Sequence, residues 1–547
     1  MTRNALAAVL VCATVGVIRA QTPLSEVIVA GDLAPGVSRS FTIQAEAEDY
    51  FNILVEAQGI GIDADVLFPN GSRLKRVSGP TTGMLPITFA AETAGAYTVR
   101  LTGRTSGEPT ESGRYSIRLT QRLSLEQRVS SRQPPRSSAI IEALKRELAQ
   151  TNSTDTSGFW TRVTASGVPV VEPLPDTKDF VLVTFLWRGN ALTRNAVVVG
   201  RIGVQPGFRD NIMTRVADTD VWFLTKKMPA GARFAYGFMV NGPLVFEGPL
   251  FFQLQAASRQ ADPLNPRMAD CADGATRYEC LSLAELPGAA PQPWIVPSDR
   301  VPKGRIASVT FKSERLKNQR TLSIYTPPGY ASDGAGNDLV VLFDEPMYLR
   351  DIPTATILDN LIAAGRIPPA VAVLVGNVNR EAELSPTPAF AEFIGNELVP
   401  WVRSNYSVTR DPARVVIGGS SHGGLAAAYV AMRHPDTFGN VLSLSGSFHW
   451  APGFVPGDPA NAPLERSWLT TEFVRSSRMN IRFWLAAGAF ESDTTGSGGI
   501  GLETSRHLRD VLLAKGYDVG YAQFPGGHDP LSWRGMLPDG LIALLGR

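Results

Sequence analysis

A serine between two glycines stands where an apolar run meets a run of small residues. In RVVIGGSSHGG, the residues Gly419, Ser421 and Gly423 fit the pattern Gly-x-Ser-x-Gly, and the segment GLAAAYVA follows at once. A sharp strand-to-helix turn of this pattern exposes a nucleophilic serine and leaves room only for small neighbours. We therefore expect Ser421 to act as a nucleophile; a turn that only caps a helix is the alternative.

A serine hydroxyl is a weak nucleophile at neutral pH and needs an imidazole to take its proton. The chain order serine, acid, histidine that accompanies this motif places the base after Ser421. Of the five histidines, His528 lies in FPGGHDP, a glycine-rich loop after the last predicted strand, and we expect it to be the base. His434 and His507 have the sequence surroundings of surface residues, and His449 those of a residue lining a pocket.

The third member of such a triad accepts the other ring N–H of the histidine and fixes its tautomer. Glu491 and Asp493 both follow the apolar run IRFWLAAG, at the predicted end of a strand. Glu491 is nearer to the strand and is the preferred acid, and Asp493 is the alternative.

The oxyanion of a tetrahedral intermediate needs two N–H donors. One comes from the residue after the nucleophile, and the other from a loop after an earlier strand. These positions fall on His422 and on Glu345, which lies in the run FDEP. Chemistry of this kind requires neither a metal nor an organic cofactor, and we expect none.

A parallel sheet is needed to bring these residues together. Over residues 304–547, strand-length apolar runs such as DLVVLFDE and AVAVLVGN alternate with segments of helical spacing such as ATILDNLIAA. Alternating strands and helices predict a mostly parallel sheet with helices on both faces. We therefore predict that residues 304–547 form an α/β-hydrolase domain that carries the catalytic residues.

The chain has 547 residues, too many for a single hydrophobic core, so several domains are expected. Short alternating runs at 22–121 and at 176–256, broken by Gly, Pro and Asn, are typical of β-sandwiches. Residues 122–175 are predicted to be a linker with an amphipathic helix, and residues 257–303 a second linker. The predicted protein is thus multidomain, with two β-sandwiches before the hydrolase domain.

The N-terminus has the layout of a secretory signal peptide, predicted over residues 1–20. An apolar run from Ala5 to Ile18 follows Arg3 and ends before the small residue Ala20. No later window offers the 20 or so apolar residues of a spanning helix. We therefore expect an exported protein, periplasmic or extracellular, without stable membrane insertion.

The overall composition and net charge indicate which kinds of partner the protein can bind. Hydrophobic residues make up 44% and charged residues 19%, which is typical of a globular protein. A formal net charge of +1 supplies no basic field for a nucleic acid, so no nucleic-acid partner is expected. Once the predicted signal peptide is removed, the exported chain has two cysteines, Cys271 and Cys280. An even number of cysteines in an exported chain predicts one disulfide.

Several motifs, in order, resemble the enterochelin esterase family. These are esterase D-like α/β-hydrolases with an N-terminal sandwich that cut the ester bonds of catecholate siderophores. The resemblance rests on VTFLWRG, DVW and DPLNP in the second sandwich, and on NREAEL, GGSSHGG, SLSGSFHW and GGHDPLSWR in the hydrolase domain. It implies that Ser421, Glu491 and His528 are nucleophile, acid and base. It also implies a small-molecule ester as substrate, with a ferric siderophore as the leading candidate.

The same resemblance places Arg380 and Glu383 at the mouth of the substrate pocket. The guanidinium there can clamp an anionic substrate; the alternative is that these two residues pair with each other. Trp450 offers its ring to an aromatic group of the substrate. The chain departs from the family at Glu345, where a glycine is usual, and at His422, where an aromatic residue or Met is usual.

Taken together, these features predict an exported serine carboxylesterase that acts on enterochelin-like esters through an acyl-enzyme. The first sandwich resembles the small secreted modules of pre-peptidase type that accompany bacterial hydrolases. Two alternatives stay open. One is a feruloyl or acetyl esterase that acts on polysaccharide-linked esters, and the other is a catalytically silent binding protein built on a hydrolase fold.

Overall fold

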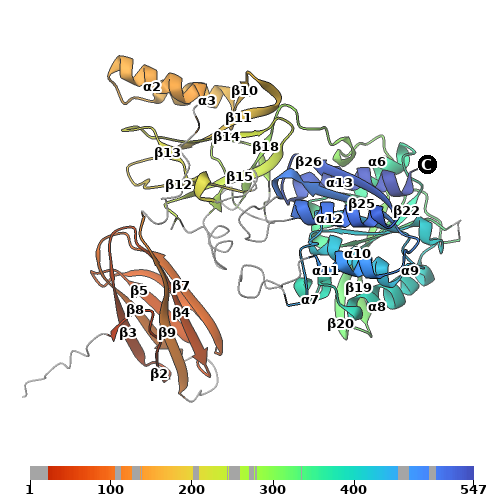
Figure 1. The fold of residues 1–547 in the computed structure, drawn as a ribbon, viewed down its shortest axis with the longest axis horizontal. Coiled ribbons are helices and arrows are strands. Elements are labelled where there is room, and N and C mark those ends of the chain that lie inside the picture. Colours follow the sequence, from red (N-terminus) through yellow and green to blue (C-terminus); the bar gives the residue numbers. More distant parts are fainter. Residues whose placement is uncertain are drawn as a thin grey trace, which may run out of the picture. The chain divides into compact units, whose positions relative to one another are not determined.

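The computed structural model divides into two compact units, residues 1–131 with 243–245, and residues 132–242 with 246–547 (Figure 1). It describes residues 22–79, 81–104, 112–125, 136, 138–200, 202, 208–242, 244, 259–269, 271, 276, 280–333, 336–453, 467–491 and 501–546. The predicted signal peptide, residues 1–20, lies outside these ranges. Within them, no helix has the length and apolar character needed to cross a bilayer.

The first unit is a β-sandwich. One sheet has the strand order β1-β3-β8-β5-β6 and the other β2-β9-β4-β7. In β4 every second residue from Phe51 to Ala57 is buried, which is the period-2 pattern of a strand with one face in a core. The strands are β1 (Thr22–Pro23), β2 (Val29–Leu33), β3 (Ser38–Ala45), β4 (Tyr50–Gln58), β5 (Ile62–Leu67), β6 (Arg73–Ser78), β7 (Gly83–Ala90), β8 (Gly95–Gly103) and β9 (Gly113–Leu123).

The second unit begins with another β-sandwich. Its sheets have the orders β10-β11-β14-β13 and β12-β15-β18-β17, with β16 paired to β15. The strands are β10 (Val170–Leu174), β11 (Thr177–Arg188), β12 (Ala196–Gly200), β13 (Thr214–Arg215), β14 (Val221–Pro229), β15 (Arg233–Val240), β16 (Arg259–Gln260), β17 (Met268–Ala269) and β18 (Leu281–Glu285). Rings of Phe185, Phe234, Tyr236 and Phe238 fill the space between the sheets.

This sandwich is larger than the sequence predicts. Strand β10 lies in the predicted first linker, and β16 to β18 lie in the predicted second linker, yet all are paired into its sheets. Their runs are short and stand among prolines and polar residues, so their pairing partners, not their own pattern, define them as strands. The helix expected in the first linker is α2 (Ala139–Thr151), and together with α3 (Ser157–Ser166) it packs on the sandwich.

The hydrolase domain follows with an eight-stranded sheet of order β19-β20-β22-β21-β23-β24-β25-β26. Strands β21 to β26 run parallel to one another, whereas β20 pairs antiparallel with both β22 and the edge strand β19. The strands are β19 (Arg305–Ser313), β20 (Asn318–Thr326), β21 (Asp338–Phe343), β22 (Ala370–Val375), β23 (Val415–Ser420), β24 (Asn440–Leu444), β25 (Arg482–Gly488) and β26 (Asp518–Phe524). The predicted fold class, two sandwiches before an α/β-hydrolase domain, is confirmed.

Helices cover both faces of this sheet (Figure 1). Residues of α5, α6 and α13 pack on one face, and residues of α7 to α12 on the other. The helices are α5 (Glu345–Arg350), α6 (Thr354–Ala363), α7 (Arg380–Leu384), α8 (Pro388–Phe393), α9 (Val399–Asn405), α10 (His422–Arg433), α11 (Trp468–Arg475), α12 (Gly501–Ala514) and α13 (Pro530–Leu545). The strand order reverses direction at β21, between β22 and β23, and ligands of such sheets bind near this point at the carboxyl ends of the strands.

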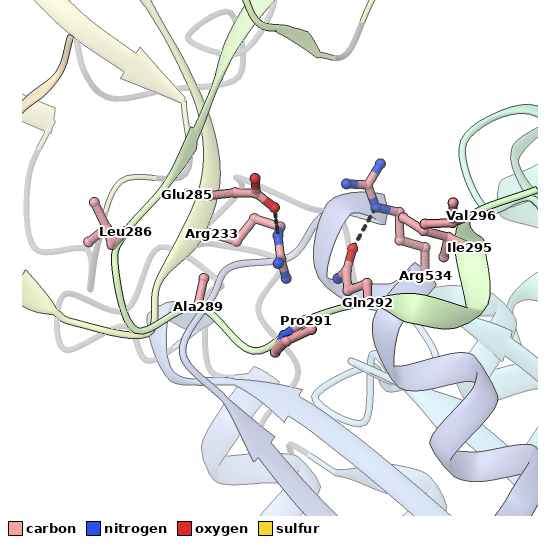
Figure 2. A pocket seen from close by; sticks show the side chains of 9 residues that line it. All are labelled: Arg233, Glu285, Leu286, Ala289, Pro291, Gln292, Ile295, Val296 and Arg534. Atoms are coloured by element: carbon pink, nitrogen blue, oxygen red, sulfur yellow. Dashed lines mark hydrogen bonds and ion pairs between the residues drawn. The ribbon is translucent and has the colours of Figure 1, made fainter. Parts of the chain in front are cut away.

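The second sandwich and the hydrolase domain share contacts within their common unit. Phe490, which directly precedes Glu491, is buried in the core of the sandwich. Gln292, in the connecting segment, donates its amide to the carbonyl of Leu531 at 2.8 Å. The carbonyl of Gln292 accepts from Nε of Arg534 at 2.9 Å (Figure 2). The sandwich therefore supports the end of β25 and the first turn of α13.

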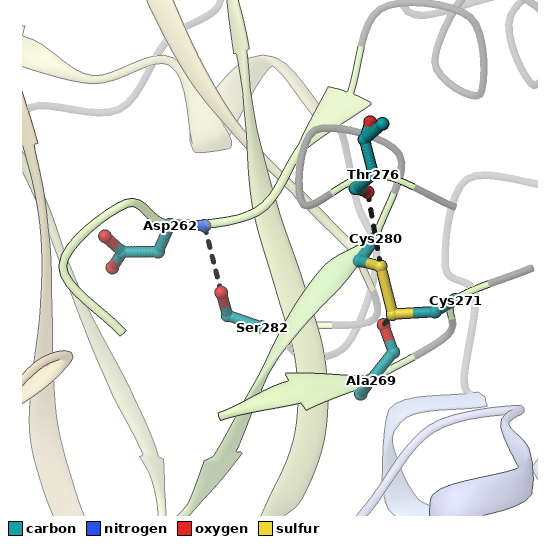
Figure 3. The surroundings of a disulfide bond; sticks show 6 residues. All are labelled: Asp262, Ala269, Cys271, Thr276, Cys280 and Ser282. Carbon is teal, nitrogen blue, oxygen red and sulfur yellow. Dashed lines mark hydrogen bonds between the residues drawn. A yellow bond between two sulfur atoms is a disulfide. The ribbon is translucent and has the colours of Figure 1, made fainter. Parts of the chain in front are cut away.

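One disulfide joins Cys271 and Cys280, as the sequence predicts (Figure 3). The bond spans the connection between β17 and β18, which pair as antiparallel neighbours. Nearby, the hydroxyl of Ser282 accepts from the backbone N–H of Asp262 at 2.9 Å. The disulfide therefore links β18, the last strand of the sandwich, to its neighbour β17. It lies directly before the segment that leads to the hydrolase domain.

Candidate active site

Ser421 lies on a strained turn between β23 and α10. Its backbone has φ 59° and ψ −124°, a conformation that residues with a side chain rarely adopt. A Cβ on Gly419 would lie 2.7 Å from the carbonyl carbon of Gly423, so only glycine fits at that position. The side chain of Ser421 is partly exposed. This is the backbone geometry that the sequence motif predicts for a nucleophile.

Glu491 and His528 come together at the carboxyl edge of the same sheet. Glu491 follows β25, His528 follows β26, and the two strands are parallel neighbours. Nδ1 of His528 lies 2.8 Å from Oε2 of Glu491. Glu491 is 6% exposed, whereas the imidazole remains partly accessible. The preferred acid of the sequence analysis therefore contacts the predicted base; Asp493, the alternative, lies outside the described residues.

Three donors hold the carboxylate of Glu491. Oε1 accepts from the hydroxyl of Ser445 at 2.6 Å and from the N–H of Gly488 at 2.7 Å, while Oε2 faces His528. Burial by itself raises the pKa of the Glu491 carboxyl. The charge of His528 and the three hydrogen bonds outweigh burial, so the pKa lies below its ordinary value. Glu491 therefore stays ionised at neutral pH and can stabilise a positive charge on His528.

Trp533 positions the histidine loop. Its Nε1–H donates to the hydroxyl of Ser445 at 2.8 Å, and its ring meets the His528 imidazole edge to face at 4.9 Å between centroids. Ser445 follows β24, the strand next to β23. The hydrogen bond from Trp533 to Ser445 thus holds the start of α13 against the end of β24, next to the strand that leads to Ser421.

The hydroxyl of Ser421 contacts that of Ser447 at 3.2 Å. Within the described residues, Ser421 and His528 form no direct hydrogen bond. A serine Oγ turns about a single χ1 bond between staggered rotamers. Catalytic hydrogen bonds are often formed only when substrate is bound. The structure therefore places nucleophile and base at one sheet edge, with the serine hydroxyl turned to Ser447.

Two helix N-termini adjoin the nucleophile. His422 is the first residue of α10 and Glu345 the first residue of α5, and these helices follow the neighbouring parallel strands β23 and β21. The first N–H groups of a helix have no acceptor within it and carry a partial positive charge. The two predicted oxyanion donors therefore lie side by side at the sheet edge. The Glu345 side chain turns inward, where its carboxylate accepts from Ser323 at 2.6 Å.

Asp344 directly precedes Glu345, and its backbone lies in the left-handed region at φ 63°. A Cβ on Gly423 would come within 3.4 Å of its Oδ2. Arg380 binds both oxygens of Asp344, at 2.7 and 2.9 Å, and Asn377 donates to Oδ1 at 2.5 Å. The predicted substrate clamp of Arg380 is thus occupied by an internal carboxylate. Its guanidinium neutralises a negative charge that would otherwise oppose an oxyanion nearby.

The predicted pocket residue Glu383 serves a different purpose. Its carboxylate binds Arg320 through two hydrogen bonds of 3.0 Å, and both side chains are buried. Glu383 therefore faces the interior, and the alternative of an Arg380 to Glu383 pair is wrong. Trp450 packs its ring edge to face on Trp468, with 5.7 Å between centroids, and remains partly exposed.

His422 is a buried imidazole next to the nucleophile. Its Nδ1 lies 3.1 Å from Oε2 of Glu381. Burial lowers the pKa of His422, and the charge of Glu381 opposes that shift only in part.

Ser445, Trp533 and Asp344 belong to the site, although their positions in the sequence do not predict it. Asp344 lies in the run FDEP and Trp533 in the run GGHDPLSWR, but neither run indicates which residues these two side chains contact. Ser445 follows an apolar strand run, VLSLSG, and a polar residue at a strand end is the one signal that marks it.

A mixed sheet with a serine on a strained elbow, and a Glu–His pair at the same edge, is the architecture of an α/β-hydrolase. Two family models match the chain in order: the enterochelin esterase N-terminal model at residues 182–295 and the putative esterase model at residues 313–544. The first falls on the second sandwich, and the second on the hydrolase domain.

Relatives that align over most of their own length agree with these matches. The iron(III) enterobactin esterase of Escherichia coli O6:H1 is 31% identical over 383 residues, which cover 66% of this chain and 90% of the relative. That of Dickeya dadantii is 29% identical, covering 71% and 92%. The crystal structure of the Shigella flexneri enterobactin esterase in the presence of enterobactin has a TM-score of 0.56 and 28% identity, covering 71% and 97%. The chain belongs to the enterochelin esterase family and is a carboxylesterase.

Proposed function

We propose that this protein is an exported serine esterase that cleaves the ester bonds of catecholate siderophores through an acyl-enzyme on Ser421. The observation that supports this substrate is the extent of the match to siderophore esterases. Iron(III) enterobactin esterase of Escherichia coli O6:H1 aligns over 383 residues and its iron(III) salmochelin esterase over 426. An endo-1,4-beta-xylanase/feruloyl esterase of Xylanibacter ruminicola aligns over 187 residues, 32% of this chain. The longer alignments favour siderophore esters over polysaccharide-linked esters.

The first half of the reaction forms the acyl-enzyme. Oγ of Ser421 attacks the ester carbonyl carbon while Nε2 of His528 accepts the hydroxyl proton. The negative oxygen of the tetrahedral intermediate is received by the N–H groups of His422 and Glu345. The intermediate collapses when the C–O bond to the alcohol breaks, and the imidazolium returns its proton to that alcohol.

The second half releases the acid. Water attacks the acyl-serine, again giving up its proton to His528, and the bond to Oγ of Ser421 breaks to regenerate the hydroxyl. Glu491, held ionised by Ser445 and Gly488, fixes the proton on Nδ1 of His528 in both halves. The chain's own residues supply every proton transfer, and the iron of a ferric siderophore belongs to the substrate.

Replacement of the nucleophile tests the mechanism. The Ser421→Ala variant is expected to lose at least about 10³-fold in kcat for p-nitrophenyl acetate, whereas Ser404→Ala, at an exposed serine of α9, keeps the wild-type rate. A fluorophosphonate probe should label the wild type and Ser404→Ala but not Ser421→Ala. Labelling and turnover that persist in Ser421→Ala would remove the acyl-enzyme proposal, and a wild type that resists the probe would favour a silent binding protein.

The substrate is tested by direct comparison. Ferric enterobactin and feruloylated xylan are incubated with the wild type and with Ser421→Ala, and the products are separated by chromatography. Release of 2,3-dihydroxybenzoyl-serine by the wild type alone is the expected result. Faster release of ferulate would assign the protein to polysaccharide esters instead.

Export is tested on the mature protein. A cell that makes the full chain is fractionated, and the N-terminus of the purified protein is sequenced. Cleavage near Ala20 and recovery outside the cytoplasm are expected. Recovery in the cytoplasm with Met1 intact would refute export without affecting the proposed reaction.

A further inference from the structure

A cavity of about 430 Å³ lies where the second sandwich, the connecting segment and α13 meet (Figure 2). Its lining does not include Ser421, Glu491 or His528. One part of the wall is apolar and consists of Leu286, Ala289, Pro291, Ile295 and Val296. The volume lies within the range of about 300 to 1,000 Å³ that is usual for small-molecule sites.

The polar part of the wall has an excess of positive charge. Arg233, on β15, donates from Nε to Glu285, on β18, at 2.6 Å (Figure 2). The other oxygen of Glu285 is bound by Arg267, which itself does not line the cavity. Arg534, on α13, adds a third guanidinium. Arg233 and Arg267 therefore share one carboxylate, and none of the described ion pairs joins the third cation to it.

Arg534 is that third cation. Its Nε–H is taken by the carbonyl of Gln292, so the two Nη groups form the free end of the guanidinium (Figure 2). Glu285 and Asp529 act on it electrostatically, but Arg534 forms no ion pair within the described ranges. Burial lowers the pKa of Arg534, and the charge of Arg233 lowers it further. A half-buried guanidinium in cationic surroundings is stabilised by an anion.

Gln292 fixes the direction of this guanidinium. Its amide nitrogen is held by the carbonyl of Leu531, and its carbonyl oxygen by Arg534, so both ends of the amide are engaged with the first turn of α13. A guanidinium held in this way presents two parallel N–H groups, which match the two oxygens of a carboxylate. The paired geometry and the apolar wall together favour a carboxylate with an apolar body.

We propose that this cavity is a binding site for a small apolar carboxylate, such as an aromatic acid, held by the two Nη groups of Arg534. The apolar body lies against Leu286 and Ile295. The site is separate from the catalytic serine and does not depend on the proposed substrate. Inorganic phosphate, which has charge but no apolar body, binds more weakly.

Calorimetric titration of the full-length protein with sodium benzoate tests the proposal. The wild type should bind benzoate, and Arg534→Gln should bind at least about tenfold more weakly because a charge-assisted pair is lost. The matched control is Arg506→Gln: Arg506, on α12, also donates to a glutamine side chain, Gln523, at 2.6 Å, but lies outside the cavity. Its affinity should stay within about twofold of the wild type.

A second variant keeps every charge. Ala289→Trp fills the cavity from its apolar side and should abolish benzoate binding even if Arg534→Gln proves unstable. Equal affinity in the wild type and both cavity variants would place benzoate elsewhere and overturn the proposal, as would a wild type that does not bind it. Inorganic phosphate that binds as tightly as benzoate would overturn the assignment to an apolar carboxylate.

Discussion

Replacing Glu491 by Gln tests its proposed role as the acid that orients the base, His528. The hydroxyl of Ser445 and the N–H of Gly488 both donate to Oε1, so the amide oxygen of a glutamine stays at that position. The amide NH₂ then takes the place of Oε2, which lies 2.8 Å from Nδ1 of His528. That NH₂ can only donate, so it selects the tautomer with the proton on Nε2. In this tautomer His528 has no lone pair facing Ser421.

The expected cost follows from this inversion. An imidazole in the wrong tautomer lowers kcat about 10⁴-fold in serine triads of this kind, which corresponds to about 5.5 kcal/mol of activation free energy. Because Gln matches Glu in shape and keeps both donors at Oε1, the folded structure should persist. The loss should therefore appear in kcat. Any change in the free energy of unfolding at neutral pH should be small compared with the loss of about 5.5 kcal/mol in activation free energy.

The assay is hydrolysis of p-nitrophenyl acetate at about pH 7.5, with circular dichroism as the check on folding. Glu397→Gln is the control: this carboxylate, away from His528, also accepts a serine hydroxyl, that of Ser313, on Oε2 at 2.7 Å and a backbone N–H, that of Glu314, on Oε1 at 2.6 Å. The control should keep the wild-type kcat. A kcat of Glu491→Gln within tenfold of the wild type would refute the role of Glu491 in orienting His528.

Three further predictions concern the neighbourhood of the site. Trp533→Phe keeps a ring against His528 but removes the N–H that Ser445 accepts, so kcat/KM for p-nitrophenyl acetate should fall about three- to tenfold; an unchanged value would show that this bond does not position the loop. Glu383→Ala leaves the buried guanidinium of Arg320 without its partner, and urea unfolding should show a loss of about 3 to 5 kcal/mol; a loss under about 1 kcal/mol would contradict the pairing. The pKa of Glu491 lies below its ordinary 4.5, so its stabilisation is complete above about pH 5 and is lost as the pH falls through the lower value of the folded state. The difference in unfolding free energy between wild type and Glu491→Gln should therefore shrink on acidification below pH 4.5, and a difference that stays constant down to pH 3 would contradict this.

The second sandwich also supports the loops that carry Glu491 and His528. Phe490 anchors the residue before the acid in the sandwich core, and Gln292 binds the first turn of the helix that follows the base. The sandwich is thus part of the scaffold that holds Glu491 and His528. This connection fits the order of the two family matches, sandwich before hydrolase, along the chain.

The parts that the sequence predicts are those determined by local backbone and burial preferences. Gly419 and Gly423 allow the sharp turn at Ser421, and the contact that excludes a side chain at Gly419 is with Gly423 itself, four residues away. The alternation of apolar strands and helices likewise follows from the burial of both sheet faces. From these two patterns follow the fold class, the elbow, and the sheet edge at which Glu491 and His528 meet.

What only the tertiary structure decided is which polar group faces which. Arg380 selects Asp344, 36 residues away, and Glu383 selects Arg320, 63 residues away, although the two residues stand in one short motif. Short strands such as β18 (Leu281–Glu285) become strands because a neighbour supplies their hydrogen bonds. A buried ion pair or a sheet pairing depends on distances between segments that the chain brings together only on folding. Sequence spacing therefore locates the chemistry, and three-dimensional packing assigns each charge its partner.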